Sequence, residues 1–529
     1  MSKNSQRLSS IDRRRFLKYT WRIAEASVAL ALLPANNLFA APKLGKNPFT
    51  LGVASSDPTS NGIVLWTRLA PEPANPLSIG KASVPVRWRV VTDEAMLNVV
   101  EHGTSVAPPQ LAHSVHVEVN GLQPARDYFY QFDVHGEESP IGHFCTAPPE
   151  DAMVAQVRFA FATCQDWPSG YYTAYRDMLQ NDLDLVLHLG DYTYEYAIDF
   201  TRRGIPVPEG FEEETVDLRT YRLRHTLYKL DHDLQAVHAK FPFVVIWDDH
   251  EVANDYSGIA PEYASPSPEF LARRAAAYQA YYEHMPIRGF KNRHPSPELR
   301  IYRRLRYSKL AEFTMLDDRQ YRTDNPCGDG ESIRCPRALN GDYTMLGRAQ
   351  EDWVADGFAQ SAARWNIVGQ QLLLAELEHR PYYEDEGYWN DAWDGYPLAR
   401  QRLLTEAVKT GLQNPVFLTG DWHSTFVNDL KLDFKDPHAA TIATEFVTPA
   451  ITTGGDSEPY GEYYGAMIPY NPHIKYFEGD KRGYFKATVT PQLMRLDLRF
   501  VDTVENPNGT GHTEKSFIVE NGVPGAQPA

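Results

Sequence analysis

Four short apolar segments each end in residues of the types that bind metal ions. They cover residues 157–164, 186–194, 244–251 and 416–423. In open α/β sheets, ligands bind beyond the carboxyl ends of the strands, so we expect these four ends to meet at one point. The ends together offer Cys164, Asp191, Tyr194, Asp249, His250, Asp421 and His423. This set contains enough hard and borderline ligands for a site with two or more metal ions.

The segment Gly190-Asp191-Tyr192-Thr193-Tyr194 gives the sharpest local prediction. A carboxylate directly after a strand can bridge two cations, because each of its oxygens binds one. A phenolate three residues later can reach the first cation, and a phenolate suits Fe³⁺ better than Zn²⁺. The alternative is an Asp-Tyr turn with Tyr194 packed in the core, and this segment alone does not decide between the two.

Two further segments carry adjacent acids and histidines. Asp248 and Asp249 follow an apolar run, and two close carboxylates repel each other unless a cation neutralises them. His250 could donate a proton to a leaving group. Asp421 and His423 lie two residues apart, so in extended backbone their side chains share one side and can hold one ion or two neighbouring ions. The alternative for both segments is a solvated polar turn.

The bulk composition narrows the classes of protein. A chain of 529 residues exceeds one ordinary core and predicts two domains. The hydrophobic fraction of 43% and the aromatic fraction of 12% indicate a globular protein. The net charge of −17 argues against binding to nucleic acid or to an anionic membrane, and it suits a protein that takes up hard cations such as Ca²⁺. An anionic substrate would then need local positive charge, which metal ions supply.

Residues 1–41 are predicted to be an export signal. Residues 12–18 match the twin-arginine pattern, and an apolar stretch over 26–33 precedes small residues near Ala40. That stretch is shorter than a transmembrane helix requires. We therefore expect the twin-arginine translocase to export the chain to the periplasm, the cell surface or the medium, with an uncleaved N-terminal anchor as the alternative. The rest of the chain shows no segment that resembles a membrane span.

Residues 46–148 predict an all-β sandwich domain. The alternation over 84–90 is typical of a strand with one buried face. The segment 122–128 is typical of the tyrosine corner of immunoglobulin or fibronectin type III sandwiches, with Tyr128 as the corner residue. These residues lack catalytic promise, which predicts a structural or substrate-shaping role for the domain.

From residue 154 to 520 strands alternate with helices, which predicts a second, α/β domain. The alternating segment 493–501 predicts a late strand and hence antiparallel members in at least one sheet. The Gly/Pro-rich residues 521–529 are predicted to form a loose tail.

Cys327 and Cys335 flank a polar loop and are the predicted disulfide of an exported protein. Amphipathic patterns predict helices over 268–282, 347–361 and 399–410.

Together the segments resemble the PhoD family of alkaline phosphatases and phosphodiesterases. This family belongs to the calcineurin-like metallophosphoesterases and is related to purple acid phosphatases. The resemblance implies an α/β catalytic domain built as a metallophosphoesterase-type β-sandwich flanked by helices, preceded by an immunoglobulin- or fibronectin-like domain. It covers nearly the whole mature chain and is carried, besides the site segments, by residues 48–58, 64–70, 315–322, 393–396 and 445–449.

The resemblance also implies how this site departs from the superfamily. Asp191 and Tyr194 fall on the Gly-Asp-x-x-Tyr block, and Cys164 stands where the first Asp usually lies. Asp249 replaces a metal-binding Asn, and Asp421 replaces the first His of a Gly-His-x-His block. The two aspartates move the second metal site toward hard oxygen ligands, which suits Ca²⁺ over Zn²⁺. The metal set reported for the family, Fe³⁺ with Ca²⁺, agrees.

The implied activity is hydrolysis of small-molecule phosphate monoesters, diesters or both by a metal-activated water. His250 would protonate the leaving group, and Arg319 or Arg322 would hold a phosphate oxygen unless they form ordinary surface salt bridges. Alternatives are a strict or phospholipase D-like phosphodiesterase with the same site, and a non-catalytic calcium-binding surface protein. The implied iron ligands are Cys164, Asp191, Tyr194 and His423, the calcium ligands Asp191, Asp249 and Asp421, and weaker candidates Asn254, Gln371 and Asp394.

Overall fold

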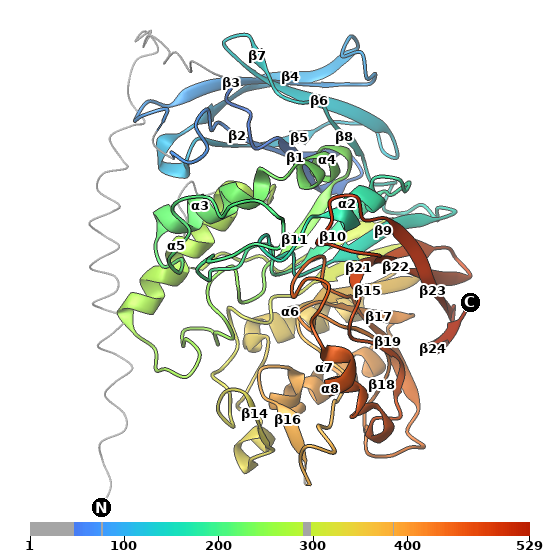
Figure 1. Cartoon of the computed structure of the whole chain (residues 1–529). Coiled ribbons are helices and arrows are strands. Elements are labelled where there is room, and N and C mark those ends of the chain that lie inside the picture. Colours follow the sequence, from blue (N-terminus) through green and yellow to red (C-terminus); the bar gives the residue numbers. More distant parts are fainter. Residues whose placement is uncertain (1–46, 76–77, 289–297, 385) are drawn as a thin grey trace, which may run out of the picture. The chain divides into compact units, whose positions relative to one another are not determined.

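Two seven-stranded sheets pack face to face and form the larger part of the protein (Figure 1). This computed structural model describes residues 47–75, 78–288, 298–384 and 386–529, so the predicted export signal lies outside the described residues. All of these described residues belong to one compact unit. Within the described ranges, no helix combines the length and the apolar character needed to cross a bilayer.

The first sheet begins with three parallel strands that are buried except at Arg158 of β9. Strand β9 pairs in parallel with β10, and β10 with β11, whereas β21 to β24 continue the sheet in antiparallel fashion. Near-continuous apolar sequence is what a sheet covered on both faces requires. In sheet order the strands are β11 (Phe243–Ile246), β10 (Leu185–Leu189), β9 (Val157–Ala162), β21 (Arg482–Val489), β22 (Leu493–Val501), β23 (Gly511–Glu520) and β24 (Val523–Pro528).

The second sheet has a parallel centre and antiparallel edges. Side chains alternate across it with the period of two that strand geometry imposes: Ile367 and Leu418 join the core between the sheets, and Val368 and Phe417 face the other way. In sheet order the strands are β12 (Arg303–Tyr307), β13 (Ala311–Met315), β15 (Trp365–Gln370), β17 (Pro415–Thr419), β19 (Thr441–Val447), β18 (Thr425–Lys431) and β20 (Ile474–Glu478).

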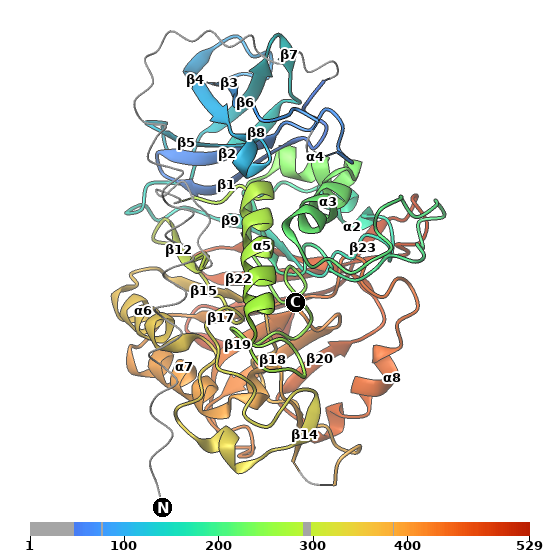
Figure 2. The ribbon, with the colours of Figure 1, turned by 90° about the vertical axis from the view of Figure 1, so that its left-hand side faces the viewer.

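Helices cover the sandwich, as predicted. Helices α6 and α7 lie on the outer face of the second sheet, where Val354 and Leu404 share a core with Phe417 (Figure 2). The start of α5 follows the expected pattern, because Ser267 Oγ accepts from Phe270 N and Pro268 occupies the first turn. The helices are α2 (Thr173–Met178), α3 (Leu218–Lys229), α4 (His232–Lys240), α5 (Pro268–His284), α6 (Gly347–Gln360), α7 (Pro397–Lys409) and α8 (Tyr460–Gly465), with 3₁₀ turns at Pro109–Leu111, Pro336–Leu339, Trp393–Gly395 and Ile468–Tyr470.

The N-terminal strands form two small antiparallel sheets around a separate apolar core. The predicted tyrosine corner is present, since Tyr128 Oη accepts a hydrogen bond from Gln123 N at 2.9 Å. One sheet contains β1 (Val53–Thr59), β2 (Gly62–Arg68) and β5 (Ser114–Asn120), and the other contains β4 (Val99–Ala107), β3 (Val84–Val91), β6 (Asp127–Val134), β7 (Glu137–Glu138) and β8 (Gly142–Cys145).

This β-domain contacts α3 and α5 through β2. Trp66 Nε1 donates to Glu283 O at 3.0 Å, and Arg68 Nη1 donates to Thr226 Oγ1 at 2.8 Å. Both side chains are fully buried there. The domain therefore shares a polar, solvent-excluded seam with the α/β domain.

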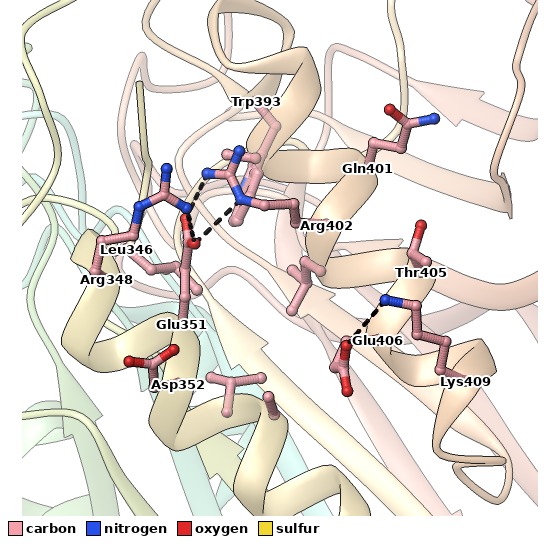
Figure 3. A pocket seen from close by; sticks show the side chains of 14 residues that line it. Leu346, Arg348, Glu351, Asp352, Trp393, Gln401, Arg402, Thr405, Glu406 and Lys409 are labelled. Atoms are coloured by element: carbon pink, nitrogen blue, oxygen red, sulfur yellow. Dashed lines mark hydrogen bonds and ion pairs between the residues drawn. The ribbon is translucent and has the colours of Figure 1, made fainter. Parts of the chain in front are cut away.

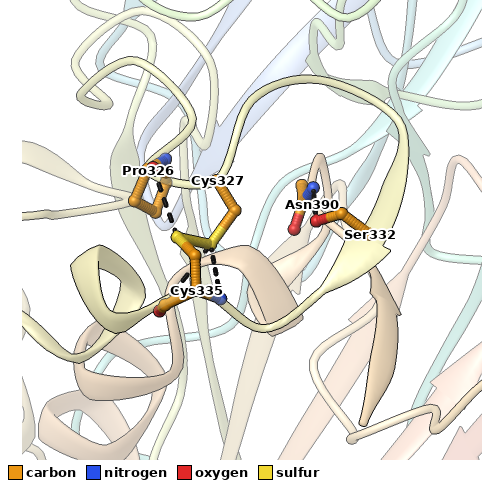
Figure 4. The surroundings of a disulfide bond; sticks show 5 residues. All are labelled: Pro326, Cys327, Ser332, Cys335 and Asn390. Atoms are coloured by element: carbon orange, nitrogen blue, oxygen red, sulfur yellow. Dashed lines mark hydrogen bonds between the residues drawn. A yellow bond between two sulfur atoms is a disulfide. The ribbon is translucent and has the colours of Figure 1, made fainter. Parts of the chain in front are cut away.

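Two local expectations have different outcomes. The disulfide between Cys327 and Cys335 is confirmed, and it closes the loop that leads through β14 (Glu331–Ile333), the partner of β16 (Gly387–Trp389) (Figure 4). The loose tail expected over 521–529 differs from the structure, in which β24 pairs with β23 and lies close to β18 and β19. Its backbone hydrogen bonds and these neighbours outweigh the local preference of a Gly/Pro-rich segment.

Candidate metal centre

The four strand ends predicted to converge do so. Strands β9, β10 and β11 of the first sheet deliver Cys164, Asp191, Asp249 and His250, and β17 of the second sheet delivers Asp421 and His423. In each of three overlapping groups, the possible ligand atoms lie within 4.8 Å of one another. The groups are Cys164, Asp191 and His423; Asp191, Asp249 and His250; and Asp248, Asp249 and Asp421. Asp191 belongs to two of them, which places it between two possible ion positions.

The backbone under these side chains is strained. Cys164, Asp191, Asp421 and His423 have φ angles of 55°, 55°, 61° and 52°, in the left-handed region. Each such non-glycine residue costs about 1–2 kcal/mol, and such outliers concentrate at functional sites. Gly190 has φ of 111°, and a Cβ there would lie 2.5 Å from Asp248 Cβ, so only glycine fits beside Asp191.

The first half of the centre contains sulfur, phenol, imidazole and carboxylate groups. Tyr194 Oη donates to Asp191 Oδ2 at 2.8 Å and lies 3.3 Å from His423 Nε2. Cys164 Sγ lies 3.3 Å from the same Asp191 oxygen. Thr453 Oγ1 lies 2.9 Å from Tyr194 Oη and donates to Cys164 O at 2.8 Å. The Tyr194 hydroxyl thus lies among the candidate ligands, although its ring is buried.

The second half consists of carboxylates gathered around Arg319. Its Nε donates to Asp248, and its Nη1 donates to Asp391 Oδ2 at 2.6 Å. Its Nη2 lies 3.5 Å from Asp249 Oδ1 and 3.5 Å from Asp421 Oδ1. The side chain is completely buried. The expectation that Arg319 holds a phosphate oxygen differs from this geometry, because its donors already face four carboxylates. In this arrangement Arg319 offsets the negative charge of those carboxylates.

The remaining candidates from the sequence lie outside the three groups. Arg322 is buried rather than on the surface, and it binds Asp391. Gln371 donates to the carbonyls of Trp247 and Leu316, which is a structural role. Asp394 pairs with Arg400. Asn254 lies near His250 but its side chain is bonded to Tyr196 and Glu262.

Glu195 is a site residue that sequence reasoning missed. Its Oε2 lies 2.8 Å from His250 Nδ1, and its Oε1 accepts from Asn254 N at 2.7 Å. The His250 ring also packs against the Tyr194 ring, with centroids 4.2 Å apart. These contacts fix the imidazole and direct its other nitrogen, Nε2, away from Glu195. An acid directly after Tyr194 was the available signal, but only the fold shows that it meets His250.

Three further residues act through the backbone or through Arg319. Glu251 accepts hydrogen bonds from the amides of Asp191, Tyr192 and Asp248 at 3.2, 2.7 and 2.9 Å, so it holds two strand ends together. Thr453 and Asp391 come from distant loops, and nothing in their local sequence marks them.

The electrostatics of the centre favour a bound cation. Burial, then the charges of Asp249 and Asp248, raise the pKa of Asp191 well above its usual value. Burial and Asp248 likewise raise the pKa of Asp421. Burial opposes ionisation of Asp249 too, but Arg319 and His250 outweigh it and lower that pKa below its usual range. Asp191 Oδ1 and Asp249 Oδ1 are buried without a hydrogen-bond partner. Unpaired buried carboxylate oxygens are costly, and a metal ion satisfies them, so the donor set fits metal binding.

A surface hollow of about 400 Å³ between α6 and α7 contrasts with the centre (Figure 3). Apart from the exposed Asp352, its charged side chains pair with each other: Arg348 and Arg402 both bind Glu351, at 2.8 and 2.7 Å, and Lys409 lies 3.7 Å from Glu406. This internal pairing leaves the hollow without the unpaired buried groups that mark the metal centre.

Comparison with known proteins gives consistent matches over almost the whole chain. The family model described as "PhoD-like phosphatase" matches residues 159–498, and "PhoD-like phosphatase, N-terminal domain" matches residues 34–148. Alkaline phosphatase D of Bacillus subtilis (strain 168) is 41% identical over 520 residues, which cover 97% of this chain and 88% of that protein.

Solved structures agree. The structure of PhoD, 41% identical, superposes with a TM-score of 0.88 and covers 92% of this chain and 93% of that one. A purple acid phosphatase from yellow lupin (Lupinus luteus) seeds, 13% identical, has a TM-score of 0.51 and covers 89% of this chain and 73% of that one. At that identity the likeness concerns the fold alone.

The two-sheet sandwich has the metallophosphoesterase type of fold, with ligand-type side chains at its strand ends. Within that type of fold, the chain belongs to the PhoD-like phosphatase family and hydrolyses phosphate esters. The resemblance seen in the sequence is thereby confirmed, together with the fold class that it implied.

Proposed function

We propose that the chain is an exported phosphoesterase whose centre holds Fe³⁺ and Ca²⁺ on opposite sides of Asp191. The observation that carries this proposal is the difference between the two halves around that shared carboxylate. One half offers a thiol, a phenol and an imidazole. The other half offers mainly carboxylates, from Asp248, Asp249 and Asp421, and its single imidazole is that of His250, to which we assign proton transfer.

The first half suits Fe³⁺. Cys164, Asp191, Tyr194 and His423 are its proposed ligands. Burial and the neighbouring Asp191 raise the pKa of Tyr194 well above its usual value, and burial and Asp191 do the same for Cys164. Ionising both groups therefore requires a highly charged cation, and phenolate is a ligand that Fe³⁺ accepts readily.

The second half suits Ca²⁺. Its proposed ligands Asp191, Asp249 and Asp421 are all carboxylates, and Ca²⁺ takes oxygen ligands in flexible geometry. Arg319 lies behind Asp249 and Asp421 and limits the negative charge that one divalent ion must balance.

The side chains around the centre have separable tasks. Bound metal ions would clamp the phosphoryl oxygens and lower the pKa of a water molecule. His250, held through Nδ1 by Glu195, presents Nε2 to the ester oxygen and donates a proton to that oxygen as the P–O bond breaks, so that the alcohol departs neutral. Glu251 and Thr453 keep the strand ends in register with this geometry.

The test is hydrolysis of p-nitrophenyl phosphate by the purified protein, before and after chelation and again after Ca²⁺ is added back. We expect activity to fall with chelation, to return with Ca²⁺, and to require bound iron measured by elemental analysis. Rates on bis-p-nitrophenyl phosphate measured in parallel separate a monoesterase from a strict diesterase. Protein that is inactive on both esters and binds no iron would contradict the proposal.

Export by the twin-arginine route is supported by the pattern at residues 12–18. Replacing Arg13, Arg14 and Arg15 together by Lys should keep the enzyme in the cytoplasm, as fractionation followed by the activity assay would show. Undiminished export of that variant would contradict this part of the proposal.

A further inference from the structure

One aromatic side chain outside the ligand set lies directly against the proposed proton donor. The rings of Tyr196 and His250 meet edge to face, with centroids 5.2 Å apart. His250 is only 8% exposed, whereas the Tyr196 side chain belongs to a residue that is 48% exposed. A molecule that approaches His250 from solvent therefore meets Tyr196 beside it.

The Tyr196 ring is held in place by its neighbours. Its hydroxyl donates to Asn254 Oδ1 at 2.9 Å, and Asn254 Nδ2 donates to Glu262 Oε2 at 2.7 Å. The backbone of Asn254 is tied to Glu195, which also holds His250. The tyrosine and the histidine thus share one support. A ring fixed in this way presents its apolar surface without the entropy cost of ordering a free side chain.

The position of Tyr196 relates to one part of the substrate. Under the proposed function, on which this inference rests, His250 protonates the oxygen of the departing alcohol. The group attached to that oxygen must then lie on the His250 side of the centre, where Tyr196 is exposed. Two aromatic rings attract each other beyond the area that they bury.

We propose that Tyr196 is a specificity-determining residue that stacks with the leaving group, and that the enzyme prefers phosphate esters of planar, ring-bearing alcohols. The ring contacts the alcohol in the bound ester and in the transition state alike. Such uniform binding lowers KM and leaves kcat unchanged.

The experiment compares phenyl phosphate with a fluoroalkyl phosphate whose alcohol has the same acidity, so that chemistry is matched and only planarity differs. For Tyr196→Leu we expect KM for phenyl phosphate to rise about 3- to 10-fold with kcat unchanged. KM for the fluoroalkyl ester should change less than about twofold. Tyr196→Phe, which keeps the ring, should behave like the parent enzyme.

The matched control is Tyr470→Leu, which removes a 45% exposed tyrosine whose ring contacts Arg380. Equal changes in KM for both esters, or a fall in kcat for both, would overturn the inference, because Tyr196 would then act on His250 or on the fold. Unchanged KM values would overturn it as well. A parent enzyme inactive on both esters would instead overturn the proposed function, and this inference with it.

Discussion

Consecutive residues at the end of β10 point into two buried polar clusters of opposite character. Asp191 lies in the metal centre among carboxylates. The Tyr192 hydroxyl lies 2.7 Å from His238 Nε2 and accepts from Lys229 Nζ at 3.1 Å. Around it is a basic cluster, defined here as Arg68, His188, His225, Lys229, His238 and His284, all of which are buried.

The two clusters manage buried charge in opposite ways. In the metal centre, orphaned carboxylate oxygens face one another, and a cation makes that arrangement favourable. In the basic cluster, burial lowers the pKa of Lys229 to about 7, and it lowers those of His188 and His225 to about 3. Those groups give up their protons instead of taking a counterion.

The difference indicates two kinds of buried polarity in one fold. In the metal centre, burial favours the protonated forms of Asp191 and Asp421, and a bound cation would keep these carboxylates ionised. The histidines and Lys229 of the basic cluster favour their neutral forms and pack: the His225 and His284 rings stack at 4.9 Å, and Lys229 lies 4.6 Å from the Trp66 ring of the N-terminal domain. The basic cluster therefore belongs to the seam between the domains.

The largest expected effect is in the metal centre. Asp191→Asn removes the carboxylate shared by both halves, and we expect kcat/KM for p-nitrophenyl phosphate to fall about 1,000-fold or more, with loss of bound metal. The control is Asp182→Asn, which changes an exposed aspartate paired with Arg158. Elemental analysis and circular dichroism accompany the kinetics; a folded variant with full activity would contradict the scheme.

Glu195→Gln should have the next largest effect. The substitution keeps the shape of the side chain but weakens its hydrogen bond to His250. We therefore expect kcat to fall about 10- to 100-fold with little change in KM. The loss should be greater for alkyl phosphates than for p-nitrophenyl phosphate, because a poor leaving group depends more on the proton. Glu195→Asp should recover part of the rate. An identical loss on both esters would assign Glu195 a purely structural role.

Lys229→Met tests the basic cluster through stability. The pKa of Lys229 is about 7 in the folded protein and 10.5 ordinarily, so between these values the unfolded chain binds the proton that the native state releases. The free energy of unfolding of the parent therefore rises with pH from about 7 to 10.5. The destabilisation caused by burying the Lys229 amine is fully present below that pH window and absent above it. Methionine at this position removes the destabilisation at every pH.

We expect Lys229→Met to be more stable than the parent by about 1–3 kcal/mol at pH 7, with the difference shrinking toward pH 10. Urea unfolding of the metal-loaded protein at pH 7, 8.5 and 10 measures it. Lys409→Met on the exposed face of α7 is the control. A stability difference that does not vary with pH would show that Lys229 is not held near neutrality by burial.

The smallest effect tests whether the clusters are independent. Tyr192→Phe removes the hydroxyl that joins His238 and Lys229, and we expect a loss of about 1 kcal/mol in unfolding free energy. Activity should stay within about twofold, since the hydroxyl points away from the centre. A tenfold fall in kcat without a change in metal content would show that the two clusters are coupled, and it would contradict their independence.

The local sequence was enough to predict several elements and most of the candidate ligands. Period-two and period-3.6 patterns predicted β22 and α5, and the capping Ser267 predicted where α5 begins. Short-range rules also predicted the disulfide of Cys327 with Cys335. These features succeed because they depend on neighbours within a few residues, whose geometry the backbone limits strongly.

The sequence by itself therefore determined which segments are buried strands and which metal-binding side chains follow them. The tertiary structure alone decided which of these meet. It placed β17 in the second sheet, enclosed Arg319 among four carboxylates, set Glu195 against His250, and gathered the basic cluster around Tyr192. Local periodicity carries no information on such pairings, because burial and long-range packing fix the partners and charges of a polar group.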